Sequence, residues 1–205
     1  MGRNYETNDP SVTEIVDLLD KPGLRYWYGK FGTAYCERVK KESTDIGHRV
    51  HKGIEQYLRG KSFSKAAKGL SNQEKLMLSR LVEWVEDEGV EFQSAEESLN
   101  SKKYHFNGTY DCTGFIKQGL WLIDWKTDST PERKEDEQER EFKYKVQIAG
   151  YILLLNENRQ IDLHRAKVVR ISKKQEFKVY TFDDLRYYED VFLQMRALYK
   201  EFKRR

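Results

Sequence analysis

The chain has 205 residues, of which 35% are charged and 38% hydrophobic, and its formal net charge is only +3. This length suits one domain with a modest core, and polyanion binding would require a local cluster of basic residues. The two cysteines fit no zinc pattern and are too few for a four-cysteine iron–sulfur cluster, so we expect none. No apolar run is long enough to span a membrane, and no signal or transit peptide is evident, which predicts a cytoplasmic protein without membrane partners.

The first part of the chain is expected to be helical. Ser11 and Glu14 have capping-box spacing and open a short helix, which the residues Asp20 to Gly23 should end. The following stretch, 24–41, alternates aromatic with basic residues. Most of these aromatic side chains fit the buried face of an amphipathic helix, whereas a surface that stacks on single-stranded nucleic acid is the functional alternative.

Two more helices are predicted before the first strand. From Thr44 to Arg59, apolar residues recur every fourth position, with His51 and Glu55 beside that face. Residues 60–69 form a short basic connector, and Ser71 opens the next helix with capping-box spacing to Glu74.

Strands then dominate, and the chain ends with alternating helices and strands. Residues 127–141 contain a proline among dense charges, which favours a mobile loop before a helix at 142–156. Asp183 is the expected cap of a final helix. This order predicts an α/β fold, a mixed sheet with helices on both faces. The strands are expected at 90–98, 104–110, 111–117, 120–126, 164–172 and 176–181, the last two as a hairpin.

Two acids and a lysine carry the chemistry. Asp124 and Lys126 are two apart in a strand and therefore share a face, while Asp111 is expected at the end of the neighbouring strand. Magnesium commonly takes one or two carboxylates plus water and phosphate oxygens, and a nearby lysine can orient and deprotonate the attacking water or stabilise transition-state charge. Taken alone, Asp124 and Lys126 fit a structural ion pair at least as well.

The ordered set of motifs changes that interpretation. In chain order it comprises Gly47-His-Arg-Val-His51, Gly108-Thr-Tyr-Asp111, Asp124-Trp-Lys126 and Gln147-Ile-Ala-Gly-Tyr151. This set resembles the PD-(D/E)XK nuclease superfamily, in particular its RecB-type branch and the mitochondrial genome maintenance exonucleases with their phage and bacterial relatives. The resemblance implies a restriction-endonuclease-like core at 90–205 and an N-terminal helical region at 1–89 that contributes the histidine motif, within one structural domain.

The resemblance also implies roles for individual residues. Lys126 would be the catalytic lysine, and Gln147 and Tyr151, four apart on one helix face, would reach the lysine or the DNA backbone. A further acid precedes the Gly108 motif in the family; Glu96 and Glu97 both qualify, and we favour Glu96. The implied metal ligands are His51, Asp111, Asp124 and the main-chain carbonyl of Trp125.

The expected activity is hydrolysis of single-stranded DNA from an end, in replication, recombination or repair, with Mg²⁺ or, given an imidazole ligand, Mn²⁺. The alternatives are a flap- or branch-specific endonuclease and a catalytically weak nucleic-acid-binding subunit. No phosphate-binding loop of a helicase is present, so a helicase or single-strand-binding protein is an expected partner. The lack of a transit peptide favours a bacterial or phage-infected cell. The residues expected to contact DNA are Arg25, Trp27, Tyr28, Lys30 and His48. All of these except His48 would form an arch over the single strand.

Overall fold

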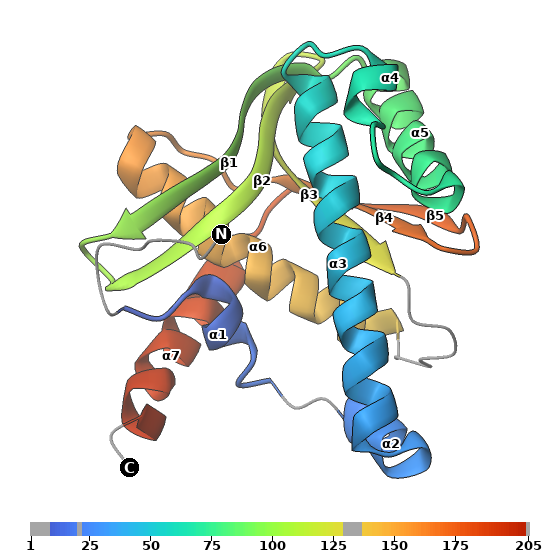
Figure 1. The fold of residues 1–205 in the computed structure, drawn as a ribbon. Helices are drawn as coiled ribbons and strands as arrows, with labels where there is room; N and C mark the ends of the chain where they lie inside the picture. The colour runs from blue at the N-terminus through green and yellow to red at the C-terminus, as the bar shows by residue number, and fades with distance from the viewer. Residues whose placement is uncertain (1–8, 20–21, 129–136, 204–205) are drawn as a thin grey trace.

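A five-stranded sheet forms the centre of the protein (Figure 1), in a computed structural model that describes residues 9–19, 22–128 and 137–203. The strands follow one another across the sheet in chain order, and only β3 and β4 are parallel. This confirms the predicted mixed sheet and the hairpin of the last two strands. The strands are β1 (Glu91–Ser101), β2 (Phe106–Ile116), β3 (Gly119–Asp128), β4 (Ala166–Ser172) and β5 (Phe177–Phe182).

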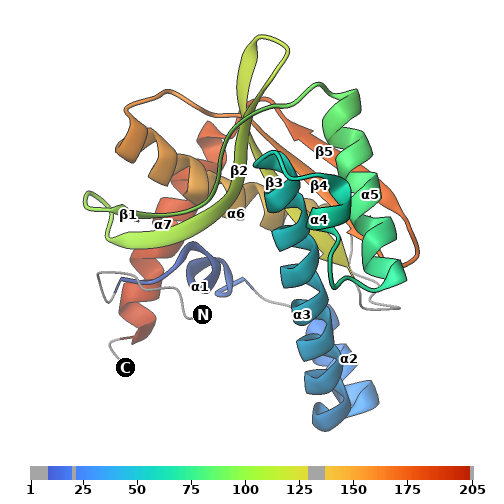
Figure 2. The same cartoon turned by 45° about the horizontal axis from the view of Figure 1, so that its top comes forward.

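Helices cover both faces of the sheet and give each face its own hydrophobic core (Figures 1 and 2). On one face pack α1 (Val12–Val16), α6 (Glu137–Arg159) and α7 (Arg186–Lys203). On the other pack α3 (Thr33–Leu58), the short α4 (Phe63–Ala66) and α5 (Asn72–Asp87). Within the described ranges, no helix is long and apolar enough to cross a membrane.

Both capping boxes form as predicted. The Ser11 side chain accepts from the Glu14 amide and the Glu14 carboxylate accepts from the Ser11 amide, and Ser71 and Glu74 make the same reciprocal pair at the start of α5. Each box satisfies amides that the first helical turn leaves without partners. These signals are local, which is why the sequence alone places the two helix starts correctly.

The predicted boundaries of three other segments are wrong. Gly32, at φ +79°, separates α2 (Pro22–Phe31) from α3, which begins eleven residues before the predicted Thr44. The connector 60–69 contains α4. Helix α6 begins at Glu137 and not at Phe142, and β3 extends to Asp128, so both ends of the predicted loop 127–141 are structured. The rest of that loop, 129–136, lies outside the described residues.

Strand β2 is one continuous strand, not the two predicted. Its pairing with β1 extends from Phe106 to Phe115, past Gly108 and Asp111, which have low intrinsic strand preference. Its ladder with β3 is shorter and begins at Cys112, opposite Ile123. Asp111 therefore lies within a strand and not at its end, but it is the first β2 residue beyond the β2–β3 ladder. Asp124 is the first such residue on β3.

Helix α2 and the first half of α3 project away from the sheet, side by side (Figures 1 and 2). The two helices are joined by an aromatic cluster, in which the Trp27 ring lies 5.6 Å from that of Tyr28 and 6.4 Å from that of Tyr35. Trp27 is 8% exposed, so most of its ring is unavailable to a ligand. Its predicted stacking on DNA therefore disagrees with its position, whereas Tyr26, 72% exposed, presents an open ring.

His164 connects β4 to the start of α7. Its Nδ1 lies 2.6 Å from Glu189 and its Nε2 lies 2.8 Å from Asp162. Nearby, the Arg186 amide donates to Asp184, 3.0 Å away, and not to the predicted Asp183. Burial alone would lower the pKa of His164, but hydrogen bonds to Glu189 and Asp162 outweigh burial and raise it.

A pH-dependent contribution to stability is expected from His164. Because its pKa is raised in the folded protein, the contribution is complete below the ordinary value of about 6.5 and is lost as pH rises through the folded value. Urea unfolding of the wild type and His164→Gln across this range should give a difference in unfolding free energy that shrinks with rising pH. A difference that grew with pH would contradict this assignment.

Candidate active centre

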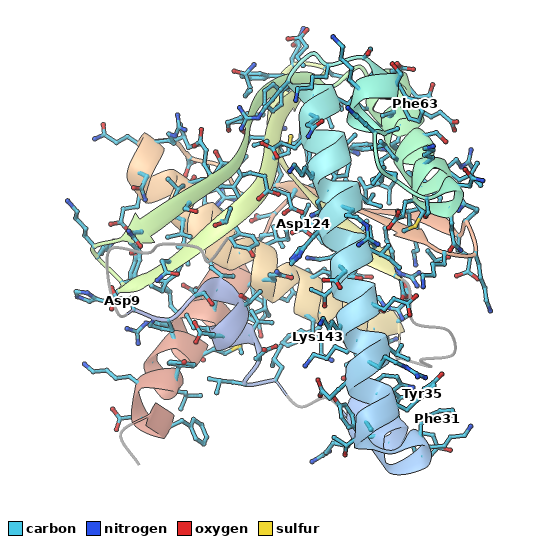
Figure 3. All side chains as sticks on the ribbon, in the orientation of Figure 1. Asp9, Phe31, Tyr35, Phe63, Asp124 and Lys143 are labelled. Atoms are coloured by element: carbon cyan, nitrogen blue, oxygen red, sulfur yellow. The ribbon has the colours of Figure 1, made fainter. Side chains whose placement is uncertain are left out.

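Asp111 and Asp124 meet where β2 and β3 cease to pair. Asp111 Oδ2 accepts a hydrogen bond from the Trp125 amide at 2.8 Å, which ties β2 to β3 at this point through a side chain. Asp124 is 2% exposed, and its Oδ2 lies 2.7 Å from Lys126 Nζ. Figure 3 labels Asp124 in the middle of the molecule, beside α3. The end of the ladder thus leaves two carboxylates and one amine in a shared interior space.

His51 reaches this space from α3. Its Nδ1 lies 3.6 Å from Asp111 Oδ2. One turn earlier, a Cβ on Gly47 would lie 2.8 Å from Thr127 Oγ1, so a glycine here lets the helix approach the end of β3 closely. Burial alone would lower the pKa of His51, but the charge and hydrogen bond of Asp111 outweigh it and raise the pKa. His48, on the same helix, is exposed and outside this contact.

Glu96 faces the same group of atoms from β1. Its neighbours Ala95 and Glu97 pair with Cys112 and Tyr110, which puts Glu96 opposite Asp111. Ligand atoms of Glu96, His51 and Asp111 all lie within 4.8 Å of one another. Glu96 has φ +53°, a left-handed conformation that is uncommon for residues other than glycine. Strain of this kind is found at functional sites, where it aims a side chain.

Glu97 is engaged elsewhere. Its carboxylate accepts a hydrogen bond from Tyr110 Oη at 2.7 Å and pairs with Arg159 of α6. Burial alone would raise the pKa of Glu97, but these two hydrogen-bond donors lower it overall. Of the two acids considered from the sequence, Glu96 is the one placed beside His51 and Asp111.

Helix α6 supplies the partners of Lys126. Lys126 Nζ donates to Gln147 Oε1 at 3.0 Å, and Gln147 Nε2 donates to Tyr151 Oη at 3.2 Å. The predicted helix pair therefore contacts the lysine directly. Sequence reasoning missed a third residue: the ring centroid of Tyr144 lies 5.8 Å from Lys126 Nζ. The signal was present, because Tyr144 precedes Gln147 by three residues and so shares its helix face.

Charge is unevenly distributed in this group, in which Asp124 is buried and His51, Asp111 and Lys126 are partly buried. Burial is the main reason that the pKa of Asp124 rises to about 6, helped by repulsion from Asp111 and opposed by Lys126. Asp111 has a lowered pKa, because His51 and Lys126 outweigh its burial. The pKa of Lys126 is raised, since the two carboxylates more than offset the burial of the amine. The centre thus concentrates negative charge around one ammonium group.

The donor set fits a divalent cation. Carboxylate oxygens are the ligands that Mg²⁺ prefers, and one imidazole nitrogen also suits Mn²⁺. Asp124 Oδ2 is buried, and among the described residues it accepts no hydrogen bond of good geometry despite its short contact with Lys126. A buried carboxylate oxygen with unused acceptor capacity is what a cation would require. The carbonyl of Trp125 as a further ligand stays a prediction.

Glycine at position 108 brings β2 and α6 together at this centre. A Cβ there would lie 3.0 Å from Tyr151 Cε1 and from Val12 Cγ2, and 3.1 Å from Leu154 Cδ1. This explains the glycine three residues before Asp111: the Tyr151 ring occupies the space of a side chain.

Gly108→Ala is expected to lower the unfolding free energy by about 1–3 kcal/mol, because it overpacks a filled core. It should also slow any reaction that depends on the position of Tyr151. Urea unfolding provides the measurement. Gly29→Ala is the control, since a Cβ there would meet nothing within 4 Å, and it should be neutral or slightly stabilising. Equal stability of the two variants would contradict the packing explanation.

A comparison with protein families gives a match that covers most of the chain. The family model described as the PD-(D/E)XK nuclease superfamily matches residues 23–205, which include every side chain of the centre described above. The chain belongs to this superfamily. Its members are nucleases that use divalent metals, and the mixed sheet flanked by helices is the restriction-endonuclease-like fold. A search of curated proteins finds no match.

Solved structures share this fold at low sequence identity. The crystal structure of SSO0001 is 15% identical with a TM-score of 0.50, over 95% of this chain and 76% of that one. A candidate exonuclease from Eubacterium rectale is 14% identical with a TM-score of 0.51, over 76% of this chain and 64% of that one. Likeness at this level concerns the fold alone.

Proposed function

We propose that this protein is a divalent-metal-dependent deoxyribonuclease that degrades single-stranded DNA from an end. The observation that carries the proposal is the convergence of His51, Asp111, Asp124 and Lys126, from three separate elements, in one interior space. A structural ion pair would not need the imidazole or the second carboxylate. Family membership supports a nuclease, and the motif order supports the RecB-type branch, whose histidine lies upstream of the core.

Mg²⁺ or Mn²⁺ would be held by the side chains of His51, Asp111 and Asp124, together with Glu96 and the Trp125 carbonyl. The cation supplies Lewis-acid activation of the attacking water and of the scissile phosphate. The ligands come from β1, β2, β3 and α3, so the sheet and one helix fix their relative positions.

Lys126 would stabilise the charge that develops on the phosphate. The Asp124 carboxylate, 2.7 Å away, and the acceptor Gln147 Oε1 keep the Lys126 Nζ charged and in place. Tyr151 in turn accepts a hydrogen bond from the Gln147 amide. A donor that is positioned before the reaction stabilises the transition state without reorganising, and such electrostatic effects are large in a buried site. Of the two roles considered for this lysine, the geometry favours electrostatic stabilisation over removal of a proton from water.

The projection formed by α2 and the first half of α3 supports the proposed preference of the enzyme for single-stranded DNA. Arg25, Tyr26 and Lys30 are exposed on α2, and Phe31 and Tyr35 are labelled in Figure 3 at the end of this projection, far from Asp124. Aromatic rings beside cations bind single strands by stacking and phosphate contacts. In this proposal the N-terminal helical region, residues 1–89, guides a strand toward the centre in the core, residues 90–205.

Charge reversal in the projection tests the guiding role. Arg25→Glu with Lys30→Glu should weaken binding of a single-stranded oligonucleotide and reduce the salt dependence of binding, because two phosphate contacts are lost. Metal binding, measured by calorimetry, should not change. Unaltered DNA affinity would rule out an arch formed by α2.

The activity itself is tested with matched linear and circular single-stranded DNA in Mg²⁺ or Mn²⁺. We expect end-labelled linear DNA to be degraded and the circle to stay intact. Cleavage of the circle, or of flaps in preference to free ends, would replace the exonuclease by a structure-specific endonuclease. Degradation that is equal for wild type and Asp124→Ala would refute the nuclease assignment. A helicase or single-strand-binding protein that supplies single strands remains the expected partner, in replication, recombination or repair.

A further inference from the structure

A second basic feature lies on α3, on the side away from the active centre. A pocket of about 580 Å³ opens between α3 and the segment 61–70 that carries α4. Its size is typical of ligand sites, and half of the residues that line it are basic. The basic residues that line it are Arg49, Lys52, Lys61, Lys65 and Lys68.

The positive charge of this pocket is largely uncompensated. No acidic residue belongs to its lining. Arg49 pairs with Glu74 through Nε at 2.8 Å, which holds the guanidinium in place as part of the wall. Within the part of the chain that the structure describes, no carboxylate pairs with the ammonium groups of the four lysines. Such a concentration is notable in a chain whose formal net charge is only +3.

The frame that carries these lysines is well packed. A Cβ on Gly53 would lie 3.0 Å from Leu78 Cδ2 and 3.4 Å from the Ala66 carbonyl, so glycine lets the α4 segment pack directly on α3. Ala66 and Leu70, which line the pocket, and Ala67 are buried. The capping box at Ser71 fixes the end of the segment. The three lysines of the segment, at positions 61, 65 and 68, therefore extend from a fixed backbone.

Helix geometry relates the pocket to the active centre. Successive residues turn by about 100° around an α-helix, so Lys52 is adjacent to His51 while Arg49 and Gln56 lie toward the opposite side. The exposed His48 and Lys52, four apart, bridge the two sides along the surface of α3. A helix with its side chains is about 10–12 Å thick, so a strand with about 3.4 Å per nucleotide needs more than three nucleotides to pass it.

We propose that this pocket binds phosphate groups of the DNA strand as it continues past the active centre. That the ligand is DNA follows from the proposed nuclease function, on which this inference rests. That the ligand carries phosphate groups follows from the pocket alone. Lysines with no acidic partner attract phosphates as point charges, without reading sequence. The same chemistry would accept a free mononucleotide, and the experiment separates the two sources.

The test compares three proteins that keep every residue of the active centre. One is wild type, and one carries Lys61→Gln, Lys65→Gln and Lys68→Gln. The control carries Lys102→Gln, Lys117→Gln and Lys200→Gln, three exposed lysines outside the pocket whose removal changes net charge equally. Binding of a fluorescent thymidine oligonucleotide is measured by anisotropy in EDTA over a series of salt concentrations. Binding of thymidine monophosphate is measured by calorimetry. Cleavage of a trinucleotide, which is too short to reach the pocket, is measured in Mg²⁺.

We expect the pocket variant to bind the oligonucleotide about tenfold more weakly, with a salt slope reduced by about 2, since each phosphate contact on a single strand contributes about 0.7. The control should keep the wild-type slope, and trinucleotide cleavage should be equal in all three proteins. Loss of monophosphate binding with unchanged oligonucleotide binding would assign the pocket to a free nucleotide. Equal binding of both ligands by all three proteins would overturn the proposal. Absence of trinucleotide cleavage by wild type would instead count against the nuclease function.

Discussion

Asp111→Asn is expected to slow hydrolysis of end-labelled single-stranded DNA by at least about 10³-fold, because a divalent cation contributes several kcal/mol of transition-state stabilisation and each 1.36 kcal/mol corresponds to a factor of ten. Asparagine keeps the size of the side chain and can still accept the 2.8 Å hydrogen bond from the Trp125 amide. The change therefore removes charge without removing the connection between β2 and β3. Calorimetric titration with Mn²⁺ should show weaker metal binding by the same variant.

The stability of this variant separates its chemical role from a structural one. Removing the Asp111 charge ends its repulsion of the buried Asp124 but also its attraction to His51 and Lys126, and these two effects on the unfolding free energy oppose each other. We expect the unfolding free energy of the metal-free variant to stay within about 1 kcal/mol of wild type. Asp128→Asn is the matched control: Asp128 lies at the end of the neighbouring strand β3, where it pairs with Arg170 at 2.5 Å, outside the centre. A cleavage rate of Asp111→Asn within tenfold of wild type would contradict its role as a ligand.

The parts of the site that sequence predicted are those that depend on local spacing. His51 and Gly47 share one helix face, as do Gln147 and Tyr151, and Asp124 and Lys126 share one strand face. The order of these motifs along the chain then indicated that they belong to one site, which their spacing alone could not. The structure brings all these side chains together, as the resemblance to the nuclease superfamily implied, and the family is confirmed.

The parts that sequence could not predict depend on contacts between distant segments. The sequence favours Glu96 over Glu97 but does not reveal the left-handed backbone within β1 that places Glu96 at the centre, because no periodic pattern encodes it. The continuity of β2 follows from its pairing with β1, which overrides the local preferences of Gly108 and Asp111. Trp27 is buried because α2 folds back against α3 at Gly32, a turn that the alternation of aromatic and basic residues does not reveal.

Lys126→Met is expected to reduce the rate of DNA hydrolysis about 10²–10³-fold, the usual effect of removing one preorganised donor from a transition state. Methionine has a similar length and fills the same space without the charge. The variant should also be less stable, because it leaves the carboxylate of Asp124, 2% exposed, without its cation beside Asp111. Breaking a buried ion pair in this way typically costs about 3–5 kcal/mol, less if Asp124 takes up a proton.

The double variant Asp124→Asn with Lys126→Met decides between an ion pair that only supports the fold and one that performs chemistry. Removing both charges should restore most of the stability lost in the single variant, because neither group is then left unpaired. Hydrolysis should stay as slow as in the slower single variant, because the acid and the amine act on the substrate and not only on each other. If the double variant recovered activity together with stability, Asp124 and Lys126 would be a structural pair, and the catalytic assignment of this centre would fail.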